Sequence, residues 1–241
     1  MKNLDGIKNV FFDLGGVLLE IDFSKTFDAF EALGIADAHK INDREDVLQL
    51  FKDFECGKYH RDEFLRLFRS LAGLDESIDS RTATRTDTGL ESVIDEEAGF
   101  GFGNVHSHPA DEQIIEAFCA LLRDYIPENI ALVQRLSKDY RVFLLSNTNA
   151  LHAAHFNAVL ERDFGISGMD QLMERAFYSH DLGFRKPDIR IFKKTMELAG
   201  VLPAESLFID DLEDNVIAAR KTGMRAVKFD VRSSKLEWMF E

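Results

Sequence analysis

The sequence predicts an α/β fold built on a central parallel sheet, and three observations lead to that prediction. Short apolar runs recur along the chain, at about 10–12, 141–146, 176–179, 207–211 and 226–229. Such continuous runs are typical of parallel strands that helices cover on both faces. Amphipathic segments with helical spacing separate the runs. Finally, several runs end on a polar residue, and open α/β sheets bind their ligands beyond the carboxyl ends of the strands.

The composition indicates a packed globular protein with a sizeable core. The chain has 241 residues, 45% of them hydrophobic, which suits one larger domain or a core with a smaller second domain. It carries 29 basic against 43 acidic residues, a formal charge of −14. This balance argues against a protein that coats nucleic acid or binds acidic membranes, so we expect neither partner. Any phosphate must be met by a local positive site.

The cysteines and the amino-terminal segment indicate a reducing, soluble setting. Cys56 and Cys119 lie in helix-like segments without metal-ligand spacing, so we expect free thiols. Asp5 and Asp13 interrupt the first apolar run, and no run reaches the roughly 18 apolar residues of a membrane span. We therefore expect a cytoplasmic protein. The sequence leaves its oligomeric state open.

The first strand is the element around which the chain is organised. It runs into Asp13 and then directly into Gly15 and Gly16, so a buried strand delivers one carboxylate to a tight turn. Taken alone, Asp13 fits a helix cap after an ordinary strand equally well.

A helical part follows the first strand. Apolar residues at helical spacing predict helices over 24–33, 43–54 and 61–71, and Asp111 and Pro127 open two more, over 111–123 and 127–138. The apolar stripes of the first three predict packing surfaces.

The helical spacing of apolar residues is lost between Ser80 and Pro109. The segment is a long loop or an inserted tongue, either a solvated surface loop or a lid in which Phe100 and Phe102 cover a substrate. His106 and His108 lack a further adequate set of metal ligands, so we do not expect zinc there.

The later strands carry the other polar ends. Ser146 and Asn147 follow one strand, Lys186 precedes the proline that opens a helix over 188–199, and Asp210 and Asp211 end a fourth apolar run. Brought together at one sheet edge, these groups make a phosphoryl-transfer site. Carboxylates can hold Mg²⁺, while hydroxyl, amide and ammonium groups bind phosphate oxygens. Each residue also has an ordinary structural interpretation: a strand-end serine, a surface lysine, an acidic helix start.

These four ordered motifs resemble those of the haloacid dehalogenase-like hydrolase superfamily. The resemblance implies a modified Rossmann core over 1–22 and 126–241, and a helical cap inserted over 23–125 between the first and second motifs, with an irregular insertion at about 80–110. It further implies that Asp13 forms an aspartyl-phosphate and that Ser146, Asn147 and Lys186 bind the phosphoryl group. The implied Mg²⁺ ligands are Asp13, the Gly15 carbonyl, Asp210 and Asp211. The motif runs are similar to those of bacterial sugar-phosphate phosphatases, notably ones that act on glucose 1-phosphate.

One departure from the family pattern concerns the general acid. Most phosphatases of this superfamily have a second aspartate two residues after the nucleophile, where this chain has Gly15. General acid–base help is typically worth about 10²–10⁴ in rate. Glu20 and Asp22 are candidates to replace it, or are simply solvated linker residues.

Three functions therefore stay open at this point. The first is a Mg²⁺-dependent phosphatase of a small phosphorylated metabolite such as a sugar phosphate. The second is a weak or inactive relative that serves as a binding or regulatory module, which Gly15 and the tongue suggest. The third is a metal-independent 2-haloacid dehalogenase, against which Asp210 and Asp211 argue, because a halide site has little use for two carboxylates beside the nucleophile.

Overall fold

The core of the protein is a five-stranded parallel sheet, as the sequence predicts. In the computed structural model, which describes residues 4–74 and 109–240, the strand order is β5-β4-β1-β6-β7. The strands are β1 (Asn9–Phe12), β4 (Arg141–Ser146), β5 (Arg175–Tyr178), β6 (Ser206–Asp210) and β7 (Arg225–Lys228). β1 lies at the centre and pairs with β4 and β6, so the first motif is flanked by the second and the fourth.

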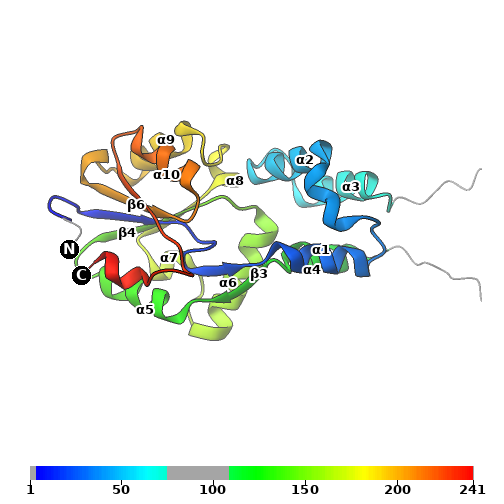
Figure 1. Ribbon diagram of the computed structural model, residues 1–241, viewed down its shortest axis with the longest axis horizontal. Coiled ribbons are helices and arrows are strands. Elements are labelled where there is room, and N and C mark those ends of the chain that lie inside the picture. Colours follow the sequence, from blue (N-terminus) through cyan, green and yellow to red (C-terminus); the bar gives the residue numbers. More distant parts are fainter. Residues whose placement is uncertain (1–3, 75–108, 241) are drawn as a thin grey trace, which may run out of the picture.

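Helices cover both faces of the sheet, which explains its unbroken apolar strands (Figure 1). Within β1, Val10 and Phe12 face one apolar cluster while Phe11 faces the other, as the two-residue period of a strand requires. One face packs on α5 (Pro127–Leu136), α6 (Ala150–Phe164), α7 (Met169–Leu172) and the 3₁₀ helix η3 (Leu236–Met239). The other packs on α8 (Ser179–Leu182), α9 (Ile189–Ala199) and α10 (Glu213–Arg220). A short 3₁₀ helix, η2 (Pro203–Glu205), precedes β6.

A separate group of helices lies beyond one end of the sheet, and we call it the helical insertion (Figure 1). It consists of α1 (Phe23–Ala32), the 3₁₀ helix η1 (Ala38–Asp43), α2 (Glu45–Glu55), α3 (Arg61–Ala72) and α4 (Asp111–Cys119). Its own apolar cluster is rich in phenylalanine, with rings that stack or tilt against one another, including Phe30, Phe54, Phe64, Phe68 and Phe118. The predicted apolar stripes of its first three helices are thus confirmed as packing surfaces.

A two-stranded ribbon joins the helical insertion to the core. Leu19–Ile21 forms β2 and Leu122–Tyr125 forms β3, and the two pair antiparallel. The prediction of one helix over 111–123 is wrong at its end, because α4 stops at Cys119 and the chain turns extended. Thr26 occupies this break: its hydroxyl donates to the Phe118 carbonyl at 3.3 Å and accepts from the Leu121 amide at 3.0 Å.

Three further predictions concern the cysteines, membrane spans and the tongue. The predicted free thiols are confirmed, with Cys119 buried and Cys56 half-buried. No helix in residues 4–74 and 109–240 is long and apolar enough to cross a membrane. The tongue between Ser80 and His108, with Phe100, Phe102 and the histidine pair, lies outside the described residues.

Candidate active site

The strand register brings the carboxylates of the first and fourth motifs together. Phe12 of β1 is level with Ile209 of β6, so the next residues, Asp13 and Asp210, leave the sheet side by side. The Asp13 amide still donates to the Ile209 carbonyl at 2.9 Å, which extends the pairing to the strand end. Because neighbouring parallel strands lie about 4.8 Å apart, the two side chains must share one small space.

Lys186 lies between these two carboxylates. Its ammonium nitrogen Nζ is 2.8 Å from Asp13 Oδ1 and 2.7 Å from Asp210 Oδ2, and it donates to the Leu145 carbonyl at 2.8 Å. Its side chain is 1% exposed. A buried ammonium needs such partners, and the two carboxylates raise the pKa of Lys186 although burial alone would lower it. The surface-lysine interpretation is therefore wrong.

Asp211 completes a cluster of three carboxylates whose negative charge Lys186 alone does not neutralise. Ligand atoms of Asp13, Asp210 and Asp211 lie within 4.8 Å of one another. Burial raises the pKa of Asp13 to about 8 even though Lys186 acts to lower it, and burial with the charge of Asp210 raises the pKa of Asp211. With all three carboxylates ionised, as the ligands of a cation are, the Lys186 ammonium leaves two negative charges to compensate. Hard oxygen ligands with that excess charge fit a Mg²⁺ ion.

The two adjacent aspartates have different surroundings. Asp210 is fully buried, and its oxygens accept from Lys186, from the Leu212 amide at 2.8 Å and from the Asn215 amide at 3.0 and 3.1 Å. Asp211 is half-buried and points its carboxylate toward the Gly15–Gly16 turn. The oxygens of Asp210 are thus occupied by these donors, and Asp211 offers the more accessible carboxylate to a metal ion. Sequence reasoning gives Asn215 no role; its place in the first turn of the helix after Asp210 is the available signal.

The glycine turn after Asp13 is shaped by close neighbours. Gly16 has a φ of +71°, and a Cβ there would lie 2.4 Å from Asp211 Oδ2, so only glycine allows this approach. At Gly15 a Cβ would lie 2.9 Å from Ile21 Cγ1. An apolar side chain thus fills the space next to position 15, where the family resemblance leads one to expect an acid. The expected role of the Gly15 carbonyl as a metal ligand stays a prediction.

The second motif forms a loop that is tied down from two sides. Ser146 ends β4 and is buried. The Asn147 side chain accepts from the Lys186 amide at 2.7 Å and donates to the Lys186 carbonyl at 2.9 Å. The Ser179 hydroxyl accepts from the Thr148 amide and donates to the Thr148 carbonyl, both at 2.9 Å. Both side-chain ends of Asn147 thus position Lys186. Its predicted phosphate contact would come from its backbone amide.

The two candidates for a replacement acid lie in different settings. Asp22 accepts from the Ser24 hydroxyl at 2.6 Å and from the Ser24 amide at 3.0 Å, so it is the N-cap of α1. The hydroxyl bond, with further help from the amide, lowers the pKa of Asp22, the wrong direction for a proton donor at neutral pH. Glu20 lies exposed in β2.

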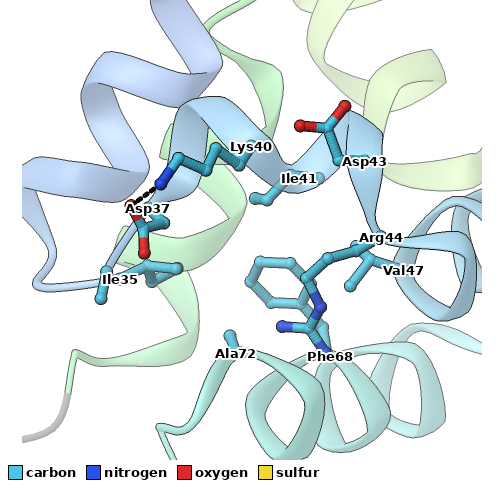
Figure 2. A pocket seen from close by; sticks show the side chains of 10 residues that line it. Ile35, Asp37, Lys40, Ile41, Asp43, Arg44, Val47, Phe68 and Ala72 are labelled. Carbon is cyan, nitrogen blue, oxygen red and sulfur yellow. Dashed lines mark hydrogen bonds and ion pairs between the residues drawn. The ribbon is translucent and has the colours of Figure 1, made fainter.

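Two hollows of similar size compete as binding sites in the described chain. One, of about 340 Å³, lies beside the strand ends and is lined by Asn147, Arg185, Lys186, Pro187 and the turn 212–215. The other, of about 370 Å³, lies wholly within the helical insertion, where Ile41, Val47, Phe68 and Arg44 line it (Figure 2). The cations there already have partners: Lys40 pairs with Asp37 at 2.8 Å and Arg44 with Asp46 at 2.7 Å. Because the cations that line the second hollow are already paired, we take the hollow at the sheet edge as the candidate active site.

The chain is similar to known hydrolases in both sequence and fold. A sequence profile of haloacid dehalogenase-like hydrolases matches residues 7–223. The D-ribitol-5-phosphate phosphatase of Bacteroides thetaiotaomicron is 31% identical over 219 residues, which make up 90% of this chain and 89% of that protein. A crystal structure of a HAD-family enzyme from the same organism, in complex with magnesium and inorganic phosphate, has a TM-score of 0.74 at 25% identity, covering 98% of this chain and 100% of that one.

A dehalogenase is also similar in fold. The 2-haloacid dehalogenase of Pseudomonas syringae has a TM-score of 0.55 at 17% identity, covering 96% of this chain and 90% of that one. At this level of sequence identity, the similarity shows only that the two proteins share a fold.

Proposed function

Because the chain belongs to the haloacid dehalogenase-like hydrolase family, we propose that it is a Mg²⁺-dependent phosphatase of a small phosphorylated metabolite, a sugar phosphate or the phosphate of a sugar alcohol. One observation carries the proposal: Lys186 is buried between Asp13 and Asp210, with Asp211 beside them, so a single cation faces three carboxylates. A site with this charge suits a dianionic phosphate only when a divalent cation is also bound.

Asp13 is the proposed nucleophile. Its Oδ1 accepts from the Leu14 amide at 2.7 Å and contacts Lys186, which fixes the orientation of the carboxylate. Its other oxygen bonds to phosphorus while the ester P–O bond breaks and the alcohol leaves. Water then hydrolyses the aspartyl-phosphate, which releases inorganic phosphate and restores Asp13. A bound Mg²⁺ would screen the repulsion between the carboxylate and the phosphate.

Ser146, Asn147 and Lys186 are the proposed phosphate ligands; Asn147 would act through its backbone amide, because its side chain is bonded to the Lys186 backbone. We assign Asp13, Asp210, Asp211 and the Gly15 carbonyl to the Mg²⁺ site, with Asp211 as the direct ligand of the adjacent pair. The leaving oxygen takes its proton from solvent, because Ile21 fills the space beside residue 15.

The helical insertion is the proposed cap over this site. It leaves the core after residue 22 and returns by residue 126, and its two ends run together in the β2–β3 ribbon. In this division residues 1–22 and 126–241 carry the chemistry, and residues 23–125 cover the organic part of the substrate. A cytoplasmic location, where phosphorylated metabolites occur, is part of the same proposal.

The proposal is tested by phosphate release from the purified protein. D-ribitol 5-phosphate, glucose 1-phosphate and glyceraldehyde 3-phosphate are each supplied with Mg²⁺ and with EDTA, and 2-chloropropionate is supplied in parallel. We expect phosphate release only with Mg²⁺ and none from the folded Asp13→Asn variant, which keeps the shape of the side chain without the nucleophile. Halide release without metal would instead indicate a dehalogenase, and binding without turnover would indicate a regulatory module.

A further inference from the structure

The helical insertion touches the core at a second place, distant in sequence from the ribbon. Glu55, the last residue of α2, pairs with Arg185 of the core: Glu55 Oε2 lies 2.7 Å from Arg185 Nε. The two side chains are 24% and 32% exposed, so the pair is partly withdrawn from water. The other ion pairs of α2, between Asp53 and Lys58 and between Arg44 and Asp46, stay inside the insertion.

A close backbone approach lies next to this ion pair. Gly57, in the turn between α2 and α3, has a φ of +68°. A Cβ on Gly57 would lie 2.1 Å from the carbonyl oxygen of His180, at the start of α8. Two independent features, the missing Cβ and the positive φ, therefore require glycine where the turn seats on the core.

Both contact points lie close to the proposed phosphate-binding residues. Arg185 directly precedes Lys186 in the chain. His180 belongs to α8, and its Nδ1 lies 3.1 Å from the Thr148 carbonyl, on the loop that begins with Ser146. The end of α2 thus contacts the residue before Lys186, and the turn after it contacts a helix that is bonded to the Ser146 loop.

We propose that the Glu55–Arg185 ion pair and the Gly57–His180 contact form a clasp that holds the insertion docked over the phosphoryl site. Glu55, Gly57 and Arg185 are then positioning residues for substrate binding. The proposal rests on the proposed phosphatase function and deepens it. A substrate that binds the docked form has an apparent affinity reduced by the docked fraction, so weakening the clasp raises KM. The reacting groups all belong to the core, so kcat changes little once substrate is bound.

The first experiment compares the steady-state kinetics of Glu55→Gln with a matched control. We expect KM for the best phosphate ester to rise measurably, by at most about five-fold because the pair is partly exposed, with kcat within about twofold of the wild type. Asp53→Asn removes the same charge from the same helix, but its partners, Gln49 and Lys58, lie inside the insertion. It should leave KM unchanged. An unchanged KM in Glu55→Gln, or equal rises in both variants, overturns the clasp.

A charge swap distinguishes an effect of the ion pair from an effect of either residue alone. Glu55→Arg and Arg185→Glu should each raise KM, and the double variant should recover to within about threefold of the wild type. If the double variant is no better than Arg185→Glu alone, Arg185 acts on the site directly and the clasp is overturned.

A distance measurement tests the clasp without activity. Glu63 and Lys193 are exposed residues of α3 and α9, and spin labels at Glu63→Cys and Lys193→Cys, with Cys56→Ser, report the separation of insertion and core. We expect one narrow distance distribution, broadened toward longer distances by Glu55→Gln and not by Asp53→Asn. An unchanged distribution overturns the clasp even if the protein is a phosphatase. Broadening in a protein that releases no phosphate would instead contradict only the proposed function.

Discussion

Asp210 and Asp211 are neighbours in the chain but have different tasks in the site. Asp210 is surrounded by donors and holds Lys186, while Asp211 is half-buried beside the glycine turn. We predict that Asp211→Asn weakens Mg²⁺ binding more than Asp210→Asn does. Asp210→Asn should instead cost more stability, because it removes a charged partner from a buried ammonium. Calorimetric titration with Mg²⁺ and urea unfolding of both variants check this, and an inverted order in either would contradict it.

In the proposed mechanism, Gly15 makes the rate depend strongly on the leaving group. Without an acid at that position, the departing oxygen would have to take its proton from solvent, and the missing help is worth about 10²–10⁴ in rate. We predict that log(kcat/KM) falls steeply as the pKa of the leaving phenol rises across a series of substituted phenyl phosphates. This quantity reports the first chemical step. A flat plot would mean that another group donates the proton.

At the scale of elements, the joint between the helical insertion and α6 is built around a buried histidine. His152 Nε2 lies 3.1 Å from the Phe118 carbonyl at the end of α4, its ring stacks on Phe118 with centroids 4.4 Å apart, and Nδ1 lies 3.2 Å from the Asn149 amide. Burial lowers the pKa of His152 from 6.5 to about 4. The joint therefore requires the neutral imidazole.

This joint predicts a pH dependence of stability. Below pH 6.5 the unfolded chain binds a proton that folded His152 takes up only near pH 4, so the contribution of His152 is present above pH 6.5 and lost as the pH falls toward 4. Between pH 7 and 5 the loss amounts to about 2 kcal/mol. In urea unfolding, His152→Gln should lose about that much less than the wild type over this interval. Equal losses would show that His152 does not titrate on unfolding.

The elements that the sequence predicts are determined by neighbouring residues, whereas the elements that it misses depend on partners far away in the chain. The strands of the core sheet are signalled by their own apolar runs, and α9 by the Asp188 cap and its periodicity. β2 and β3 have three and four residues, and each is extended only because the other, about 100 residues away, pairs with it. Local propensity contains no trace of such a partner, so Leu122 and Arg123 read as the end of a helix.

The candidate site divides in the same way. Asp13, Ser146, Lys186 and Asp210–Asp211 could be predicted because each stands at a strand end or before a helix, and parallel topology collects such ends at one edge. The burial of Lys186 and the Glu55–Arg185 pair could not. They depend on tertiary packing between segments whose separation in sequence does not constrain their distance in space.

On the scale of the whole molecule, we expect the fold to be independent of the metal but to gain stability from it. Neither apolar cluster of the core includes a proposed metal ligand, and the acidic cluster is confined to one sheet edge. At a Mg²⁺ concentration 100 times its Kd, binding contributes about 2.7 kcal/mol, which for a chain of this size raises Tm by roughly 5–10 °C. Thermal unfolding with Mg²⁺ and with EDTA should show this rise, and the rise should shrink in Asp211→Asn. A protein that unfolds when EDTA is added would contradict a metal-independent core.

The ribbon between core and helical insertion has a consequence for how such a protein can be rebuilt. The chain leaves the core along β2 and returns along β3, and at the far end of this ribbon the Asp22 amide donates to the Leu121 carbonyl at 2.9 Å. The two crossing points are thus in contact, so a short hairpin loop could close the gap if everything between them were excised. The same geometry lets a foreign module be spliced in without moving a strand of the sheet. The sheet edge with the candidate site and the helical insertion can therefore be exchanged independently of each other.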